Sequence, residues 1–221
     1  MCPATSRAAA VIFDLDGVLL DTEPLYTRAS ATIAAEFGKV FDYALKARIM
    51  GRSEEESAKI LLTALAIPLT VEEYLARRER LLRPLFANAP AIPGAAEVIP
   101  WLHGRKVPLA VATSSARHLY SIKTSHHDWM GAFDAVICGD DPRVERPKPA
   151  PDIFLVAAQA LAVPPSRCVV VEDSPAGMEA ALSAGMQLVV LADPRTPLPA
   201  LPETARVVSR HATATFIELG L

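Results

Sequence analysis

The sequence predicts an α/β protein: a parallel sheet with helices on both faces, interrupted after its first strand by an all-helical segment. Two observations predict this fold. From about residue 88 onward, short apolar, β-branched runs alternate with helical stretches, which is typical of parallel strands joined by crossover helices. Between residues 24 and 86, by contrast, apolar residues recur at helical spacing and no strand-like run occurs.

Five apolar runs are expected to form the sheet. The first, residues 8–13, is short, partly β-branched and followed by Asp14, and such runs are typical of strands buried on both faces. The other expected strands are residues 107–113, 133–138, 168–173 and 187–191. The proline-rich segment 193–202 is expected to be a loop, and a short helix is expected at the end of the sequence.

The helical segment has its own start and stop signals. Pro24 suits the first position of a helix, and Gly38 is expected to end that helix. Ser53–Glu56 and Thr70–Glu73 each match the capping box, in which two residues bond to each other's backbone at a helix start. We therefore expect two domains: a core of residues 1–22 and 88–221, and a helical domain of residues 23–87.

Composition excludes several classes of protein. A net charge of −3 over 221 residues gives no basic footprint for nucleic acid. No apolar run is long enough to cross a membrane, and the six-residue run before Asp14 is too short for a secretory signal. The three cysteines are odd in number and far apart, so we expect them to be reduced. These features predict a cytoplasmic protein.

Polar side chains collect where the predicted strands end. Asp14 and Asp16 follow the first strand, Thr113–Ser115 end the second, and Glu172 and Asp173 end the fourth. In an open parallel sheet, ligands bind at the carboxyl ends of the strands, where the strand order reverses. Burying several carboxylates there costs several kcal/mol unless a cation or hydrogen bonds offset it. The convergence of these residues predicts a binding site.

These residue types suit phosphoryl transfer. Clustered carboxylates, with no His or Cys at ligand spacing, favour a hard cation such as Mg²⁺. One carboxylate beside that cation can attack phosphorus, and a second can protonate the leaving oxygen. The hydroxyls of Thr113 and Ser114 can hold phosphoryl oxygens, although Ser is also common at helix starts. Lys148, flanked by prolines, can neutralise their charge, the alternative being a solvated loop lysine.

At these residues the chain resembles the haloacid dehalogenase-like phosphohydrolases. Four motifs carry the resemblance: Asp14-Leu-Asp16-Gly17, the strand ending in Thr113, Lys148 before Pro-Ala-Pro-Asp, and Glu172-Asp173-Ser-Pro-Ala-Gly. They occur in the family's order, and the resemblance extends over essentially the whole chain. The family implies a Rossmann-like core, a helical cap inserted between the first two motifs, and hydrolysis of a small phosphorylated metabolite.

The resemblance also implies catalytic roles. Asp14 would be the nucleophile that forms an aspartyl-phosphate, and Asp16 would be the general acid and base. Thr113 and Lys148 would grip the transferring phosphoryl group, with Ser114 nearby. Lys148 would also orient the carboxylate of Asp14.

The implied cofactor is Mg²⁺, bound by acids of the first and fourth motifs. Its ligands would be Asp14, the backbone carbonyl of Asp16, and Asp173. Glu172 would assist directly or through water.

Two related activities fit the sequence less well. Dehalogenases lack the second acid, so Asp16 argues against dehalogenation. The β-phosphoglucomutases share both acids and the cap type, and they are the rival assignment. Where they carry a His this chain has Tyr26, and where they carry a phosphate-binding Arg it has Glu54. An acid does not hold a phosphate, which disfavours the mutase; a phosphometabolite-binding protein without turnover is a further alternative.

Secondary motifs are most like those of pseudouridine-5′-phosphatases and of sugar- and glycerol-phosphate phosphatases. They are Asp21–Tyr26, Ile49–Arg52, Ala112–Ser115, Lys123–Ser125 and Gly139–Pro142. Specificity is expected from the cap: Tyr26 is either a core residue or a substrate-facing hydroxyl, and Arg52, next to Gly51, either reaches the substrate or is solvated. The expected substrate is pseudouridine 5′-phosphate or a sugar or polyol phosphate, hydrolysed by a monomer or, alternatively, a dimer.

Overall fold

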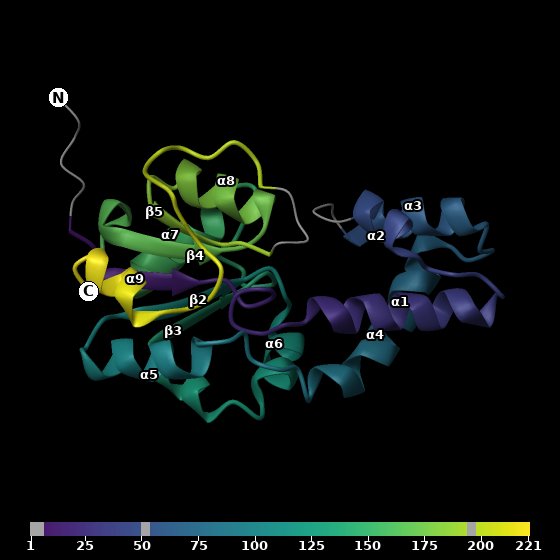
Figure 1. Ribbon diagram of the computed structural model, residues 1–221, viewed down its shortest axis with the longest axis horizontal. Helices are drawn as coiled ribbons and strands as arrows, with labels where there is room; N and C mark the ends of the chain where they lie inside the picture. Colours follow the sequence, from purple (N-terminus) through teal and green to yellow (C-terminus); the bar gives the residue numbers. More distant parts are fainter. Residues whose placement is uncertain (1–6, 50–53, 194–197) are drawn as a thin grey trace. The chain divides into compact units, whose positions relative to one another are not determined.

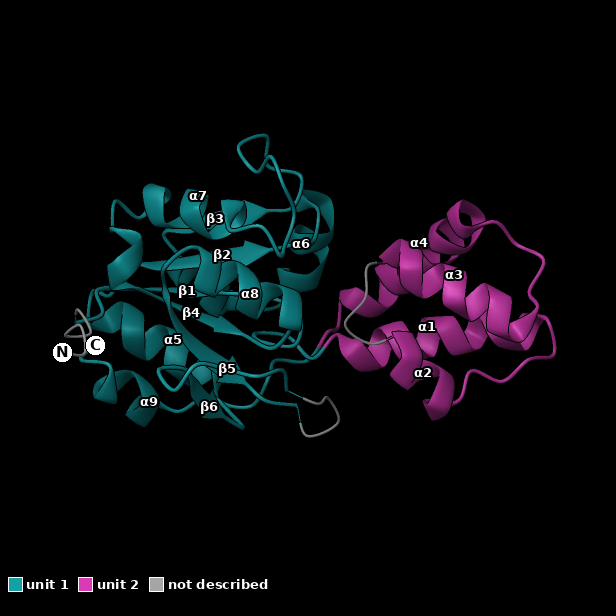
Figure 2. Ribbon diagram, turned by 90° about the horizontal axis from the view of Figure 1, so that it is seen from above, with its two compact units in different colours: residues 1–21, 90–221 teal, residues 22–89 magenta. Residues whose placement is uncertain are grey.

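The chain folds into two compact units (Figure 2). The computed structural model describes residues 7–49, 54–193 and 198–221. Residues 1–21 and 90–221 form one unit, here called the core unit, and residues 22–89 form the other, the helical unit. These boundaries differ by one or two residues from the domain boundaries that the sequence predicts.

The core unit is built on a six-stranded parallel sheet of order β3-β2-β1-β4-β5-β6 (Figure 1). Its strands are β1 (Ala10–Phe13), β2 (Leu109–Thr113), β3 (Ala135–Cys138), β4 (Cys168–Glu172), β5 (Gln187–Leu191) and β6 (Arg206–Val208). Its α-helices are α5 (Ala95–Gly104), α6 (Arg117–Thr124), α7 (Asp152–Ala160), α8 (Pro175–Ser183) and α9 (Thr213–Glu218). The predicted α/β class is confirmed. The strand order reverses at β1, so the carboxyl ends of β1, β2 and β4 lie side by side, the usual position of a ligand site.

The observed strands depart from the predicted ones at their ends. Strands β1, β2 and β3 each begin two residues later than predicted. At β2 the reason is the end of α5: Lys106 has a φ of 60°, and the N–H of Val107 bonds to the carbonyl of Leu102. β6 lies between the predicted loop and the terminal helix; its three residues are partly exposed and form a strand by pairing with β5.

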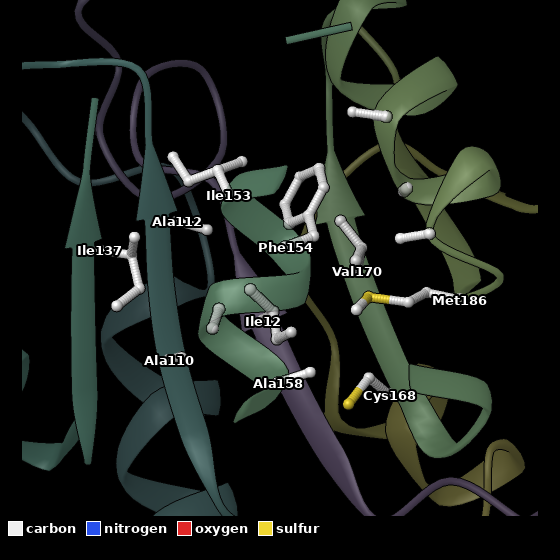
Figure 3. Packing of buried hydrophobic residues seen from close by; sticks show 14 of the residues in the cluster. Ile12, Ala110, Ala112, Ile137, Ile153, Phe154, Ala158, Cys168, Val170 and Met186 are labelled. Atoms are coloured by element: carbon white, nitrogen blue, oxygen red, sulfur yellow. The ribbon is translucent and has the colours of Figure 1, made fainter. Parts of the chain in front are cut away.

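Alternate side chains of β1 face two helical layers. Ile12 packs with Phe154 of α7 in an apolar cluster that also includes residues of α8 (Figure 3). Phe13 faces the opposite side, where its ring lies 6.0 Å from that of Phe216 in α9. Helix α5 lies on this second side (Figure 1). Both faces of β1 are buried, which explains its wholly apolar sequence.

The helical unit contains α1 (Glu23–Glu36), α2 (Tyr43–Ile49), α3 (Glu54–Leu65) and α4 (Val71–Phe86), and no strand among its described residues. The capping box predicted at Thr70 is present: Glu73 N–H donates to Thr70 Oγ1 at 3.1 Å, and Thr70 N–H donates to Glu73 Oε2 at 2.8 Å. Ser53, of the other predicted box, lies outside the described residues. Among the helices in the described ranges, none has the length and apolar character needed to cross a membrane.

The segment between β6 and α9 supports the loop that follows β1. His211 is buried there, and its Nε2–H donates to the carbonyl oxygen of Val18 at 2.7 Å. It packs against Gly94, where a Cβ would lie 2.3 Å from the carbonyl oxygen of His211. Burial holds the pKa of His211 below its ordinary value, although the hydrogen bond to Val18 acts in the opposite direction.

We predict that His211 makes the fold less stable in mild acid. Because its folded-state pKa lies below the unfolded value of about 6.5, the unfolded chain binds the proton first, and stability is lost as the pH falls through that value. His211→Gln keeps an N–H donor but does not titrate. It should therefore reduce the drop in melting temperature between about pH 7 and pH 5.

The exposed His103 provides a matched control, since its Nδ1 also lies within hydrogen-bond distance of a backbone carbonyl, that of Ala132 at 3.1 Å. Melting curves of His211→Gln and His103→Gln should be recorded over the same pH series. A His211→Gln variant that keeps the full pH dependence of the wild type would contradict the prediction.

Candidate active site

Three strand ends meet around Asp14 at one rim of the sheet. The register of β1 places Phe13 beside Val111 of β2 and Val171 of β4. Asp14, the next residue, is therefore level with Ala112, the last but one residue of β2, and with Glu172, the last residue of β4. Its backbone N–H donates to the carbonyl oxygen of Val171 at 3.0 Å, and its side chain is buried. Asp14 is thus positioned by the sheet itself.

Lys148 joins the three strand ends through its ammonium group. Its Nζ donates to Asp14 Oδ1 at 2.6 Å, to Glu172 Oε1 at 2.6 Å and to the carbonyl oxygen of Ala112 at 3.2 Å. The same atom lies 4.8 Å from the centroid of the Phe154 ring. Burial by itself lowers the pKa of Lys148, but the two carboxylates outweigh it and hold the pKa above its ordinary value. With only 6% of its side chain exposed, Lys148 is not a solvated loop lysine.

Glu172 anchors both Lys148 and the turn into α8. While its Oε1 accepts from Lys148, its Oε2 accepts from the backbone N–H groups of Asp173 and Ser174, each at 2.9 Å, and from the Ser174 hydroxyl at 3.0 Å. Gly177 makes room for this carboxylate, because a Cβ there would lie 1.8 Å from Oε1. Both oxygens of Glu172 are therefore engaged by protein donors.

Asp14 and Asp173 are crowded acids that burial makes harder to ionise. Desolvation raises the pKa of Asp14 to about 7, although the charge of Lys148 lowers it. Desolvation, followed by the charges of Glu172 and Asp14, raises the pKa of Asp173 well above its ordinary value. Gly17, with a φ of +82°, makes room for the Asp173 carboxylate, because a Cβ at Gly17 would lie 2.1 Å from its Oδ2.

Asp16 is held through both of its carboxylate oxygens. Lys123 Nζ donates to Oδ1 at 2.6 Å, and the Ser115 hydroxyl donates to Oδ2 at 2.9 Å. The Asp16 side chain remains 27% exposed. Unlike Asp14, this acid therefore lies at the solvent side of the rim.

The two hydroxyl residues predicted to hold phosphate lie in different environments. Thr113, the last residue of β2, is fully buried, and its Oγ1 accepts the N–H of Ser115 at 3.0 Å. Ser114 is exposed. Ser115, rather than Ser114, contacts Asp16, the second acid of the first motif.

The donor set at the rim fits a divalent cation. Four carboxylates lie among two lysines, leaving an excess of negative charge: Asp14, Asp16, Glu172 and Asp173 with Lys123 and Lys148. Oxygen ligands of this kind suit Mg²⁺, which commonly uses one or two carboxylates and retains several waters. Across the described ranges, no three His, Cys, Asp or Glu side chains are already arranged to hold a metal ion. Water and backbone carbonyls would therefore have to complete the coordination shell.

Ser115 and Lys123 contact Asp16, and the sequence analysis did not predict either contact, although it placed Ser115 at the rim and Lys123 in a secondary motif. Lys123 lies in α6, four residues after Leu119 and on the same helix face. That spacing was the available signal for an inward-facing lysine. It was weak, because lysines on short helices usually face solvent.

Tyr26 packs within the helical unit. Its ring centroid lies 5.4 Å from that of Phe86 and 5.3 Å from the guanidinium carbon of Arg78. Arg78 also forms an ion pair with Glu54 at 2.8 Å. Gly51 and Arg52, the other predicted specificity residues, lie outside the described residues.

Comparison with known proteins gives a family for this chain. Residues 8–185 match the model of the haloacid dehalogenase-like hydrolases. The chain is 43% identical over 188 residues to a probable pseudouridine-5′-phosphatase of Drosophila melanogaster, covering 83% of this chain and 81% of that protein. It is 41% identical over 191 residues to (DL)-glycerol-3-phosphatase 2 of Arabidopsis thaliana, covering 84% and 80%.

A solved structure agrees with these sequence comparisons. The crystal structure of a putative β-phosphoglucomutase from Thermotoga maritima matches with a TM-score of 0.74 and 34% identity, covering 90% of this chain and 93% of that one. The chain therefore belongs to the haloacid dehalogenase-like hydrolase family, as one of its phosphatases.

Proposed function

We propose that the protein is a Mg²⁺-dependent phosphatase that hydrolyses a small phosphorylated metabolite through an aspartyl-phosphate on Asp14. The observation that carries the proposal is the contact of Asp14 with Lys148, which fixes a buried carboxylate against an ammonium group at the sheet rim. A second acid, Asp16, follows two residues later. The similarity to named phosphatases supports the class of reaction.

Asp14 acts as the nucleophile. Lys148 bonds to its Oδ1, so Oδ2 is the oxygen that attacks phosphorus. Glu172 and Ala112 hold Lys148 in place. Its ammonium group therefore supplies a fixed positive charge that stabilises the negative charge on the phosphoryl oxygens. As the bond from phosphorus to Asp14 forms, the bond to the leaving oxygen breaks, and Asp16 gives that oxygen a proton. Asp16 then takes a proton from the water that hydrolyses the aspartyl-phosphate, which releases phosphate and restores Asp14.

Asp14, Asp173 and the backbone carbonyl of Asp16 are the groups that would hold Mg²⁺. When bound, the cation supplies positive charge that screens the repulsion between a carboxylate and a phosphate. Glu172 is better suited to positioning, since its two oxygens already accept from Lys148 and from backbone N–H groups.

The remaining predicted residues complete this proposal. Thr113 and Ser114, at the end of β2, are assigned to the phosphoryl group, and Tyr26, Gly51 and Arg52 to substrate selection. Both cysteines in the described ranges, Cys138 and Cys168, are buried and unpaired, which supports a reducing compartment such as the cytoplasm.

The proposed substrate is pseudouridine 5′-phosphate or a sugar or polyol phosphate. The names of the similar proteins support these classes, and a panel of such esters, read as phosphate release, tests them.

The alternative activity is that of a mutase, and it is supported by the name of the similar solved structure, a putative β-phosphoglucomutase. Phosphorus NMR separates the two, because a mutase yields an isomerised sugar phosphate without free phosphate. Glu54, ion-paired with Arg78, argues against the mutase, because it places an acid where mutases have a phosphate-binding Arg.

Asp14→Asn should abolish phosphate release. An amide lacks the nucleophilic oxygen, so hydrolysis of p-nitrophenyl phosphate with Mg²⁺ should fall by at least about 10³-fold. The variant should still fold, because it removes one of several crowded negative charges.

Asp128→Asn, at an exposed position, is the matched control and should keep its activity. Melting temperatures of both variants separate lost chemistry from lost structure. Substantial activity in a folded Asp14→Asn protein would overturn the assignment of the nucleophile.

The affinity for Mg²⁺ should rise with pH. Burial raises the pKa of Asp14 to about 7, so below that pH the carboxyl group must lose its proton before it can bind a cation. We expect the Kd for Mg²⁺, measured by titration calorimetry, to decrease from about pH 6 to about pH 8, with release of protons. Asp14→Asn should weaken this pH dependence, and a wild-type Kd that is independent of pH would refute the idea.

A further inference from the structure

Lys123, Ser115 and Asp16 each form a hydrogen bond with the other two. Lys123 Nζ donates to Asp16 Oδ1 at 2.6 Å and to Ser115 Oγ at 2.9 Å, and the Ser115 hydroxyl donates to Asp16 Oδ2 at 2.9 Å. The lysine comes from α6, the serine from the turn after β2, and the acid from the loop after β1. Two side chains from outside the first motif therefore fix the plane of the Asp16 carboxylate.

Burial differs sharply across this ion pair. The Lys123 side chain is 0% exposed, whereas that of Asp16 is 27% exposed. Lysine is rarely buried without a charged partner, and Asp16 supplies one. The arrangement orients the carboxylate from its buried side and leaves part of it accessible from the other side.

We propose that Lys123, with Ser115, positions Asp16 for proton transfer to the leaving group. The inference rests on the proposed function, in which Asp16 protonates the leaving oxygen. Holding the carboxyl group in place before the ester binds reduces the entropy that must be lost in the reaction. The proton passes from Asp16 to the leaving oxygen and is later recovered from the attacking water. Lys123 gives up no proton, so it is a positioning residue.

A purely structural ion pair would behave differently. If Lys123 merely tied α6 to the loop after β1, its loss would lower stability and would slow the reaction of every ester by a similar factor. A residue that positions the general acid matters in proportion to how much the leaving group needs a proton. Two esters of similar shape and different leaving group distinguish these cases.

The experiment compares Lys123→Met with the wild type on phenyl phosphate and p-nitrophenyl phosphate in the presence of Mg²⁺. Phenoxide is the more basic leaving group and depends more on protonation. The ratio kcat/KM is measured because it reports steps through cleavage of the ester and excludes later hydrolysis of a shared aspartyl-phosphate. We expect kcat/KM for phenyl phosphate to fall about tenfold more than that for p-nitrophenyl phosphate.

A double-mutant cycle ties this effect to Asp16. Asp16→Asn should change the ratio of the two kcat/KM values in the same direction, and adding Lys123→Met to it should change the ratio no further. Ser115→Ala provides a second variant if Lys123→Met does not fold, and it should shift the ratio in the same direction. Lys106→Met, at an exposed position of the core unit, is the control for loss of a lysine and should leave the ratio unchanged.

Equal losses for both esters, or independent effects of Lys123→Met and Asp16→Asn, would overturn the positioning role. Those results leave the phosphatase proposal intact. A wild-type protein that releases no phosphate from either ester would instead overturn both proposals, and active Asp14→Asn would overturn the nucleophile assignment alone.

Discussion

The rim of the core unit depends on the buried ammonium group of Lys148. It contacts residues at the ends of β1, β2 and β4, two of them carboxylates at 2.6 Å. Carboxylates gathered in a poorly solvated place repel one another and resist ionisation unless a cation is near. Loss of Lys148 would leave both carboxylates buried without a positive partner, a change that typically costs about 3–5 kcal/mol, so the same interaction serves both the fold and the site. Its compensation is incomplete, since the pKa of Asp14 remains raised to about 7.

Two glycines allow the acids to come this close. A Cβ at Gly17 would lie 2.1 Å from Oδ2 of Asp173, and one at Gly177 would lie 1.8 Å from Oε1 of Glu172. Each glycine belongs to one acid-rich motif, and Gly17 makes room for an acid of the other. The first and fourth motifs therefore pack directly against each other as well as interacting through their charges. A side chain at either glycine would clash with a carboxylate, which gives a physical reason for a glycine soon after the acids in each motif.

The sequence predicts the fold better than it predicts the site's supporting contacts. Apolar runs ending in Asp14, Thr113 and Glu172 reveal the sheet and its functional rim, because strand periodicity and buried charge are local signals. β6 has no such signal, since three partly exposed residues become a strand only by pairing with β5. Likewise, the burial of Lys123 depends on where Asp16 lies, 107 residues away in the chain. Nor does the sequence reveal that the Glu172 oxygens accept from Lys148 and the backbone.

The two lysines give the two acids of the first motif different environments. Lys148 bonds to one oxygen of Asp14, inside a nearly dry rim where only 9% of the Asp14 side chain is exposed. Lys123 and Ser115 bond to both oxygens of Asp16, which stays partly exposed. In the proposed reaction this difference is useful. A nucleophile reacts best when water is excluded from it, whereas a general acid must meet a leaving oxygen that arrives from solvent. Residues two positions apart can therefore perform opposite tasks because different segments of the chain supply their partners: the loop before α7 for Asp14, and α6 with the turn after β2 for Asp16.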